Sequence, residues 1–326
     1  MALTLAQAKV GMADKVDQMV IDEFRRSSML LDSLVFDNAV SPTGGSTLVY
    51  GYQRIVTPST ADFRAINGEY TPDEAIREQI TVNLKIFGGS FEIDRVIADT
   101  SGAIDEVDLQ LKQKIKSAVN LFHYITINGD EASDVDAFDG LDVILAGSDT
   151  EYNLTAVVDL STSAKIVDNA LAFVGQMDEF LALLDEKPTY LMANSKMIAK
   201  LKAVGRQVGY LTASEDAFGR SISAYDGIPL VDLGDSLMVN GTMAKTIPIE
   251  SRTVGTAQTG LTDIYAVRIG LDGFHGVSLA GDKLVKTWLP DFSVAGAVKK
   301  GEVEMVGAIA LKSTKSAGVF RNIKVQ

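Results

Sequence analysis

The chain has 326 residues, no cysteine and a formal charge of −13, from 43 acidic against 30 basic residues. The lack of cysteine excludes disulfides, thiolate zinc sites and cysteine nucleophiles, and the acidic balance argues against binding nucleic acid by broad electrostatic attraction. No apolar run approaches the roughly 18 residues that cross a bilayer, and the first residues, MALTLAQAKVGMADK, lack the pattern of a secretory signal. We therefore expect no membrane partner and a protein that is made and used inside a cell.

The first 40 residues are predicted to be helical, because apolar side chains from Val16 to Leu34 recur at roughly helical spacing. The segment SPTGGS, residues 41–46, then breaks the pattern with proline and paired glycines. We expect both chain termini to dock on a surface, because termini fray unless something ties them down.

Two β-strands are predicted next, TLVYGYQRIVT (47–57) and QITVNLKIF (79–87). The second alternates strictly between apolar and polar residues, which is typical of a half-buried antiparallel strand. The segment between them, residues 58–78, is charged and polar, with Phe63, Ile66 and Ile76 as its large apolar residues. An isolated two-stranded arm is marginal in water. We therefore predict a long hairpin with a polar tip that lies on a partner.

The rest of the chain mixes helices with strands of antiparallel type. Amphipathic spacing predicts a long helix from Ala103 to about Ile127 and a second from Ser163 to about Glu186. Between them, DAFDGLDVILAG is expected to be a loop and a short apolar strand. The segments PTYLMAN and SKMIAKLKAV predict a strand and a short helix, and a strand-rich C-terminal half follows. Because regular βαβ alternation is missing, the predicted fold class is α+β.

No catalytic, cofactor or metal site can be assembled from the motifs. The two histidines, His123 and His275, are isolated and are expected to be structural or exposed. Ser278 in GVSLAG misses the nucleophile-elbow pattern by one residue, and no histidine follows it. The acidic stretch between Lys116 and Lys165 lacks the spacing of a calcium loop, and we interpret it as a solvated face.

The order of these parts resembles the major capsid proteins of tailed bacteriophages, which have the Hong Kong-type capsid fold. The matching parts are a helical arm ending in SSMLLDSLVF, the long hairpin, a spine helix in IDEVDLQLKQKIKSAVNLFHYITINGD, the segment AFDGLDVIL, and the closing strands VEMVGAIALKSTKSAGVFRNI. The resemblance covers almost the whole chain and lies in order and spacing. It implies an N-terminal arm (1–43), an extended β-hairpin loop (44–92), a peripheral domain (93–150 and 262–317) and an axial domain (151–261 and 318–326).

By this resemblance the protein is a structural subunit and not an enzyme, with itself as its main partner, in pentamers and hexamers of an icosahedral shell around double-stranded DNA. A separate scaffolding protein, a portal and DNA without sequence-specific contact are the other expected partners, and the location is the virion capsid, assembled in the bacterial cytoplasm. The hairpin would meet a neighbouring subunit through its charges. The interface candidates are Arg54, Asp62, Arg64, Glu69, Asp73, Glu74, Arg77 and Glu78.

Two alternative functions remain open. An encapsulin, which is a protein shell for enzyme cargo, shares this fold, and a soluble α+β enzyme without recognisable motifs is the other alternative. The best-known capsid protein of the family joins its subunits by isopeptide bonds between a lysine of the extended loop and an asparagine of a neighbour. Here residues 44–91 contain one lysine, Lys85, near the base of the hairpin. Arginine stays protonated and cannot replace it as a nucleophile, so we predict shells without crosslinks.

Overall fold

A computed structural model describes residues 29–40, 48–100, 106–209, 211–215, 221–238, 241–279 and 285–326. Most of the predicted N-terminal helix, and with it the expected docking of the N-terminus, lies outside these residues. The described part begins with a short helix, α2 (Met29–Ser33), followed by strand β1 (Phe36–Val40). The prediction of helix up to residue 40 is therefore wrong at its end. The reason is tertiary, since β1 pairs in parallel with β14 (Phe274–Leu279) and Phe36 covers Gly276, where a Cβ atom would lie 2.4 Å from its ring.

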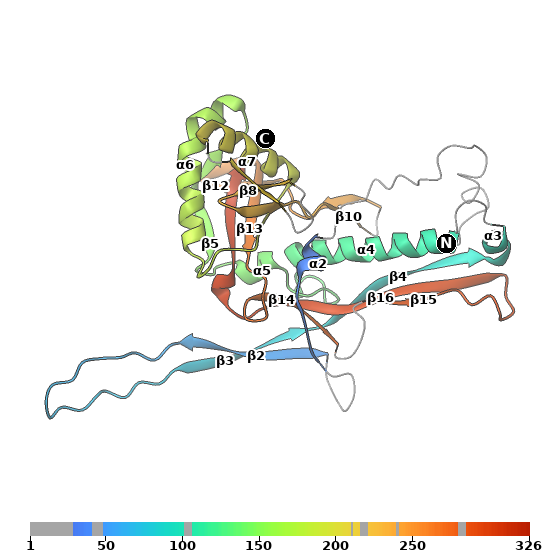
Figure 1. Ribbon diagram of the computed structural model, residues 1–326, viewed down its shortest axis with the longest axis horizontal. Coiled ribbons are helices and arrows are strands. Elements are labelled where there is room, and N and C mark those ends of the chain that lie inside the picture. The colour runs from blue at the N-terminus through green and yellow to red at the C-terminus, as the bar shows by residue number, and fades with distance from the viewer. Residues whose placement is uncertain are drawn as a thin grey trace.

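The hairpin consists of β2 (Val49–Thr57) and β3 (Ile76–Asn83), and it projects from the body of the molecule (Figure 1). The predicted return strand, 79–87, is in strand conformation except at Leu84, but it does not pair with β2 over its whole length. The main-chain N–H of Leu84 donates a hydrogen bond to the carbonyl of Leu48. From the next residue, β4 (Lys85–Asp94) pairs with β16 (Val298–Leu311) instead of β2. The alternating pattern runs through this change of partner, and Ile86 is consequently 58% exposed.

A five-stranded sheet forms the elongated part of the molecule, in the order β1-β14-β16-β15, with β4 also paired to β16. Strand β15 spans Val285–Trp288, and the short helix α3 spans Arg95–Asp99. Helix α4 (Glu106–Asn128) lies along the long strands (Figure 1). It confirms the predicted spine helix over its described part. Its fully buried Phe122 stacks on Phe87 of β4, with ring centroids 5.8 Å apart, which fixes the helix on the sheet.

The second part is an eight-stranded sheet in the order β5-β17-β13-β6-β9-β8-β7, with β12 paired to β13. Its strands are β5 (Glu151–Asp159), β6 (Tyr190–Ala193), β7 (Leu211–Glu215), β8 (Ser221–Tyr225), β9 (Ile228–Val231), β12 (Glu250–Val254), β13 (Thr256–Val267) and β17 (Ala317–Lys324). Helices α6 (Ser163–Ala182) and α7 (Ser195–Val208) pack on it around Phe173, Phe180 and Phe320. The C-terminal strand therefore lies inside the sheet, as docking of the C-terminus predicted.

Three smaller elements complete the described chain. Strands β10 (Asp235–Leu237) and β11 (Met243–Lys245) form a small ribbon, and η1 (Thr314–Ser316) is a 3-10 turn before β17. The segment predicted as a short strand is a helix, α5 (Leu141–Leu145). Leu141 and Leu145, four residues apart, both face the core. A short apolar run is compatible with a strand or a helix. The helix is favoured here because it buries both leucines on one face. The α+β class is confirmed.

Candidate subunit interface

The hairpin tip, residues 58–75, connects β2 to β3 and is exposed throughout. It is nevertheless held in shape by local contacts. The main-chain N–H and hydroxyl of Thr60 both donate to Oδ2 of Asp73, at 2.6 and 2.8 Å, and so bridge the two sides of the tip. These hydrogen bonds to the charged form lower the pKa of Asp73 below its ordinary value. The turn itself contains Asn67 with a φ of 64° and closes with Gly68 N–H donating to the carbonyl of Ala65.

Large apolar side chains project from this tip into solvent. Phe63 is 100% exposed, Ile66 is 92% exposed and Tyr70 is 61% exposed. The guanidinium of Arg64 lies 5.5 Å from the ring centroid of Tyr70, so one charge is held against an aromatic face. Exposed single apolar residues are ordinary, but a cluster on a protruding segment marks a surface for a partner.

The predicted interface charges fall into two groups. Seven of them lie on the exposed hairpin, and within the described residues none has an ion-pair partner: Asp62, Arg64, Glu69, Asp73, Glu74, Arg77 and Glu78. Arg54 differs, because Nε and Nη2 donate to the carbonyls of Lys312 and Leu311, at 3.0 and 2.6 Å. It anchors the hairpin base to the end of β16 in its own chain, which sequence spacing could not distinguish from a role at the tip.

A polar cluster beside Arg54 joins four strands at the hairpin base. The hydroxyl of Tyr50 in β2 donates to Oδ2 of Asp37 in β1 at 2.7 Å and lies 3.5 Å from Nε2 of His275 in β14. Burial, and then the hydrogen bond with Asp37, raise the pKa of Tyr50. Lys312, at the end of β16, lies 3.7 Å from the same carboxylate. His275 is fully buried, and burial lowers its pKa. Of the two expected situations, structural or exposed, the burial of His275 excludes the exposed one, and the lack of a catalytic role stays a prediction.

A groove of about 170 Å³ opens between the hairpin base and the body. Its walls are partly apolar and partly polar, and they come from β2, β3, the loop before α5, α5 and β16. The lining residues are Tyr52, Arg54, Ile80, Thr81, Val82, Asn83, Glu131, Phe138, Asp139, Ile144, Ile309, Ala310 and Leu311. The groove thus lies at the base of the hairpin, and the hairpin tip lies at the far end of the same hairpin (Figure 1).

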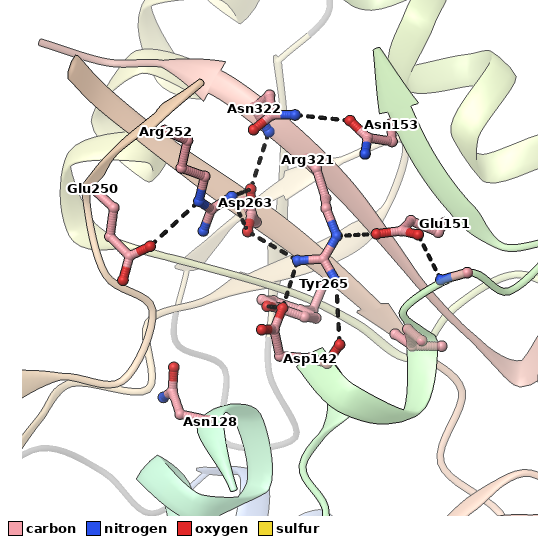
Figure 2. A network of polar contacts seen from close by, with 12 residues as sticks. Asn128, Asp142, Glu151, Asn153, Glu250, Arg252, Asp263, Tyr265, Arg321 and Asn322 are labelled. Carbon is pink, nitrogen blue, oxygen red and sulfur yellow. Dashed lines mark hydrogen bonds and ion pairs between the residues drawn. The ribbon is translucent and has the colours of Figure 1, made fainter. Parts of the chain in front are cut away.

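A buried ionic network links strands β5, β12, β13 and β17 of the eight-stranded sheet to helix α5 (Figure 2). Arg321 is 12% exposed and binds Glu151 and Asp142, and its Nη1 lies 3.5 Å from Oδ2 of Asp263. Asp263 is 2% exposed and also accepts two hydrogen bonds from Arg252, both at 2.7 Å. Burial raises the pKa of Asp263, and the two guanidinium groups oppose that effect.

This network corrects the interpretation of the acidic stretch as merely a solvated face. Two of its carboxylates, Asp142 and Glu151, pair with Arg321, and Glu131 pairs with Lys85 at 2.8 Å. Asp130 and Asp134 accept main-chain N–H groups of their own loop. Over the ranges that the structure describes, no cluster of His, Asp or Glu suits a metal ion, and no helix is both long and apolar enough to cross a membrane.

The comparisons with known proteins are structural, since no protein-family model and no curated protein matches the chain. The holo-SrpI encapsulin complex from Synechococcus elongatus PCC 7942 contains a similar subunit, with 16% identity, a TM-score of 0.66, and coverage of 100% of this chain and 98% of that one. The capsid of a native GTA particle follows, with 13% identity, a TM-score of 0.62 and coverage of 98% of each chain. The capsid of Myoviridae phage XM1 has 9% identity, a TM-score of 0.59 and coverage of 99% of each chain.

These similarities extend over whole chains, so they define the class of fold to which this chain belongs, which is the fold of the encapsulin and capsid subunits named above. More particularly, the chain has the Hong Kong-type capsid fold of tailed-phage major capsid proteins, as the order of its parts predicted. At these identities it is the fold that is shared.

Proposed function

We propose that this chain is the major capsid protein of a tailed bacteriophage, a structural subunit without enzymatic activity that assembles into an icosahedral shell around double-stranded DNA. The observation that carries the proposal is the hairpin tip. It is exposed over its whole length, held in shape, apolar at Phe63 and Ile66, and charged without ion-pair partners among the described residues. A segment of that kind is explained by a contact with a neighbouring subunit.

The proposed domains follow from the family resemblance: arm 1–43, extended loop 44–92, peripheral domain 93–150 with 262–317, and axial domain 151–261 with 318–326. Pentamers and hexamers of this subunit, a separate scaffolding protein and a portal are the proposed partners. The charge of −13 supports a container for DNA, because a lining that gripped phosphates would hinder packing and release. The proposed location is the virion capsid, formed in the bacterial cytoplasm.

A shortened hairpin tests the proposal. Replacing residues 58–75 by Asn-Gly joins Thr57 to Ile76, which pair directly in the present hairpin, through a turn that suits two-residue connections. We expect a subunit with unchanged circular dichroism and thermal unfolding that forms no stable shells by negative-stain microscopy. Normal particles from this variant, or a wild-type chain that stays monomeric at every concentration and under crowding, would refute the proposal.

An encapsulin shell is the second candidate, favoured by the similarity to the holo-SrpI subunit. The contents of particles purified from the native source separate the two functions. Nuclease-protected DNA of defined length supports the capsid, whereas particles that contain a protein cargo and no protected DNA support the encapsulin.

A further inference from the structure

The groove at the hairpin base has the size and lining of a site for one aromatic side chain. An apolar cavity of about 150 Å³ accepts a benzene molecule, and the groove measures about 170 Å³. Ile80 and Val82 of β3, Phe138, Ile144 of α5 and Ile309 of β16 provide its apolar walls. The groove therefore has room for a phenyl ring, with both apolar and polar groups in its lining, and is too small for a helix or a strand.

The same chain presents a matching side chain at the other end of the hairpin. Phe63 is 100% exposed, whereas Phe122, Phe173, Phe180, Phe274 and Phe320 are fully buried. Within the described part of the chain, no aromatic contact involves the Phe63 ring. Leaving a phenylalanine in water forfeits most of its hydrophobic contribution, so its position at the tip calls for an apolar site on another molecule.

The charges around the two features are complementary. Phe63 lies between Asp62 and Arg64, one acidic and one basic residue. At the rim of the groove, Arg54 donates to main-chain carbonyls, so its positive charge is not neutralised by a carboxylate among the described residues. Asp139 accepts the N–H of Glu131 and likewise has no cationic partner there. Asp62 can therefore meet Arg54 while Arg64 meets Asp139, which fixes the direction in which the ring enters.

We propose that Phe63 of one subunit inserts into this groove of a second copy of the chain. The groove lies at the hairpin base and Phe63 in the hairpin tip. These two ends of the hairpin are far apart (Figure 1), so a subunit cannot fill its own groove. Each copy offers one ring and one groove, and the contact is head-to-tail. A head-to-tail contact repeats from copy to copy and closes into a ring where the rotation permits. This inference rests on the proposed function and names the partner surface of the tip.

Truncating the ring gives the first test. Phe63→Ala should raise the subunit concentration needed for half-maximal assembly by about tenfold or more, since a buried aromatic ring is lost from every contact. Leu171→Ala is the matched control, because Leu171 is a large apolar residue that is 78% exposed on α6, away from the hairpin. We expect it to shift assembly much less. Equal effects of the two variants would overturn the assignment of Phe63.

Disulfide trapping gives the second test, without background because the chain has no cysteine. Oxidised assemblies of the double variant F63C/I144C should give a ladder of covalent multimers in non-reducing gels. F63C/V167C is the control, because Val167 lies on α6 and is 57% exposed. If I144C destabilises the subunit, D139C places the thiol on the exposed rim of the same groove.

The outcomes separate this inference from the proposed function. Shells that form normally while F63C/I144C and F63C/D139C crosslink no more than the control overturn the groove contact and leave the capsid function standing. Wild-type protein that forms no particles overturns both. A ladder from the groove variants alone, with particles visible in the same samples, supports both.

Discussion

Replacing Arg321 by methionine tests the ionic network that links α5 to the eight-stranded sheet. Arg321 is 12% exposed, and the variant leaves Glu151, 17% exposed, and Asp263, 2% exposed, without one of their cationic partners. Removing one member of a buried ion pair costs about 3–5 kcal/mol. Asp142 is 45% exposed and can be solvated, and Asp263 keeps Arg252. We therefore expect a loss near the lower limit, about 3 kcal/mol in the free energy of unfolding.

Equilibrium unfolding of the purified subunit in urea, followed by circular dichroism, measures this loss. Lys315→Met is the matched control, because the Lys315–Asp185 pair is 51% and 60% exposed. Exposed pairs contribute about 0–1 kcal/mol. Adding Glu151→Gln to the Arg321 variant should recover part of the loss, because it removes a stranded carboxylate. A loss from Arg321→Met within about 1 kcal/mol of the control's, on the scale expected for exposed pairs, would refute the view that these charges are buried and interdependent.

Three further predictions concern single positions. Mature particles boiled in detergent should run as one band near the 34.9 kDa of the chain. Lys85 Nζ donates hydrogen bonds to Glu131 and to the carbonyl of Val135 in its own subunit, so we expect no lysine crosslink to a neighbour. Covalent multimers would contradict this prediction. Gly140→Ala should lower the free energy of unfolding in urea by about 2 kcal/mol or more, since the new Cβ would lie 2.5 Å from the carbonyl oxygen of Ile127. Gly175→Ala, which places its Cβ in open space on α6, should raise the free energy of unfolding by about 0.5–1 kcal/mol. Equal effects of the two variants would refute the packing argument. The hydrogen bonds from Lys85 and Asn83 lower the pKa of Glu131 below its ordinary value of 4.5, so their contribution to stability is complete above that pH and is lost as the pH falls through the lowered pKa. The difference in unfolding free energy between wild type and Glu131→Gln should therefore shrink below pH 4.5, and a difference that stays constant would contradict it.

Much of the fold could be predicted from local patterns. The periodicity of α4 and the strand-rich C-terminal half were sufficient, because each pattern reports a face that is buried over many residues. The break at Leu84 could not be predicted, because the alternation continues while the strand changes partner from β2 to β16. The identity of α5 was ambiguous for a similar reason, since five apolar-rich residues fit a strand or a helix.

The sites show the same division between local and distant information. The hairpin tip was visible because polarity is a local property, whereas Arg54 was assigned with the tip although its partners lie in β16. The Arg321 network joins residues up to 179 positions apart, and no spacing rule reports such contacts. One signal was available, since a single arginine inside the apolar strand GVFRNIKV requires a buried partner. The acidic stretch supplies two of those partners, Asp142 and Glu151, but nothing in its sequence distinguishes these paired carboxylates from solvated ones.

The position of β17 has a consequence for the rate at which the subunit folds. Strand β17 (Ala317–Lys324) is an inner strand between β5 and β13, and its Val319 pairs with Glu151 of β5, which is distant in the sequence. Until β17 docks, β5 and β13 have an open gap between them, and Asp263 lacks its contact with Arg321. Pairing between strands that are far apart in the sequence is intrinsically slow. We therefore expect the closing of the eight-stranded sheet to be a late step in the folding of the subunit.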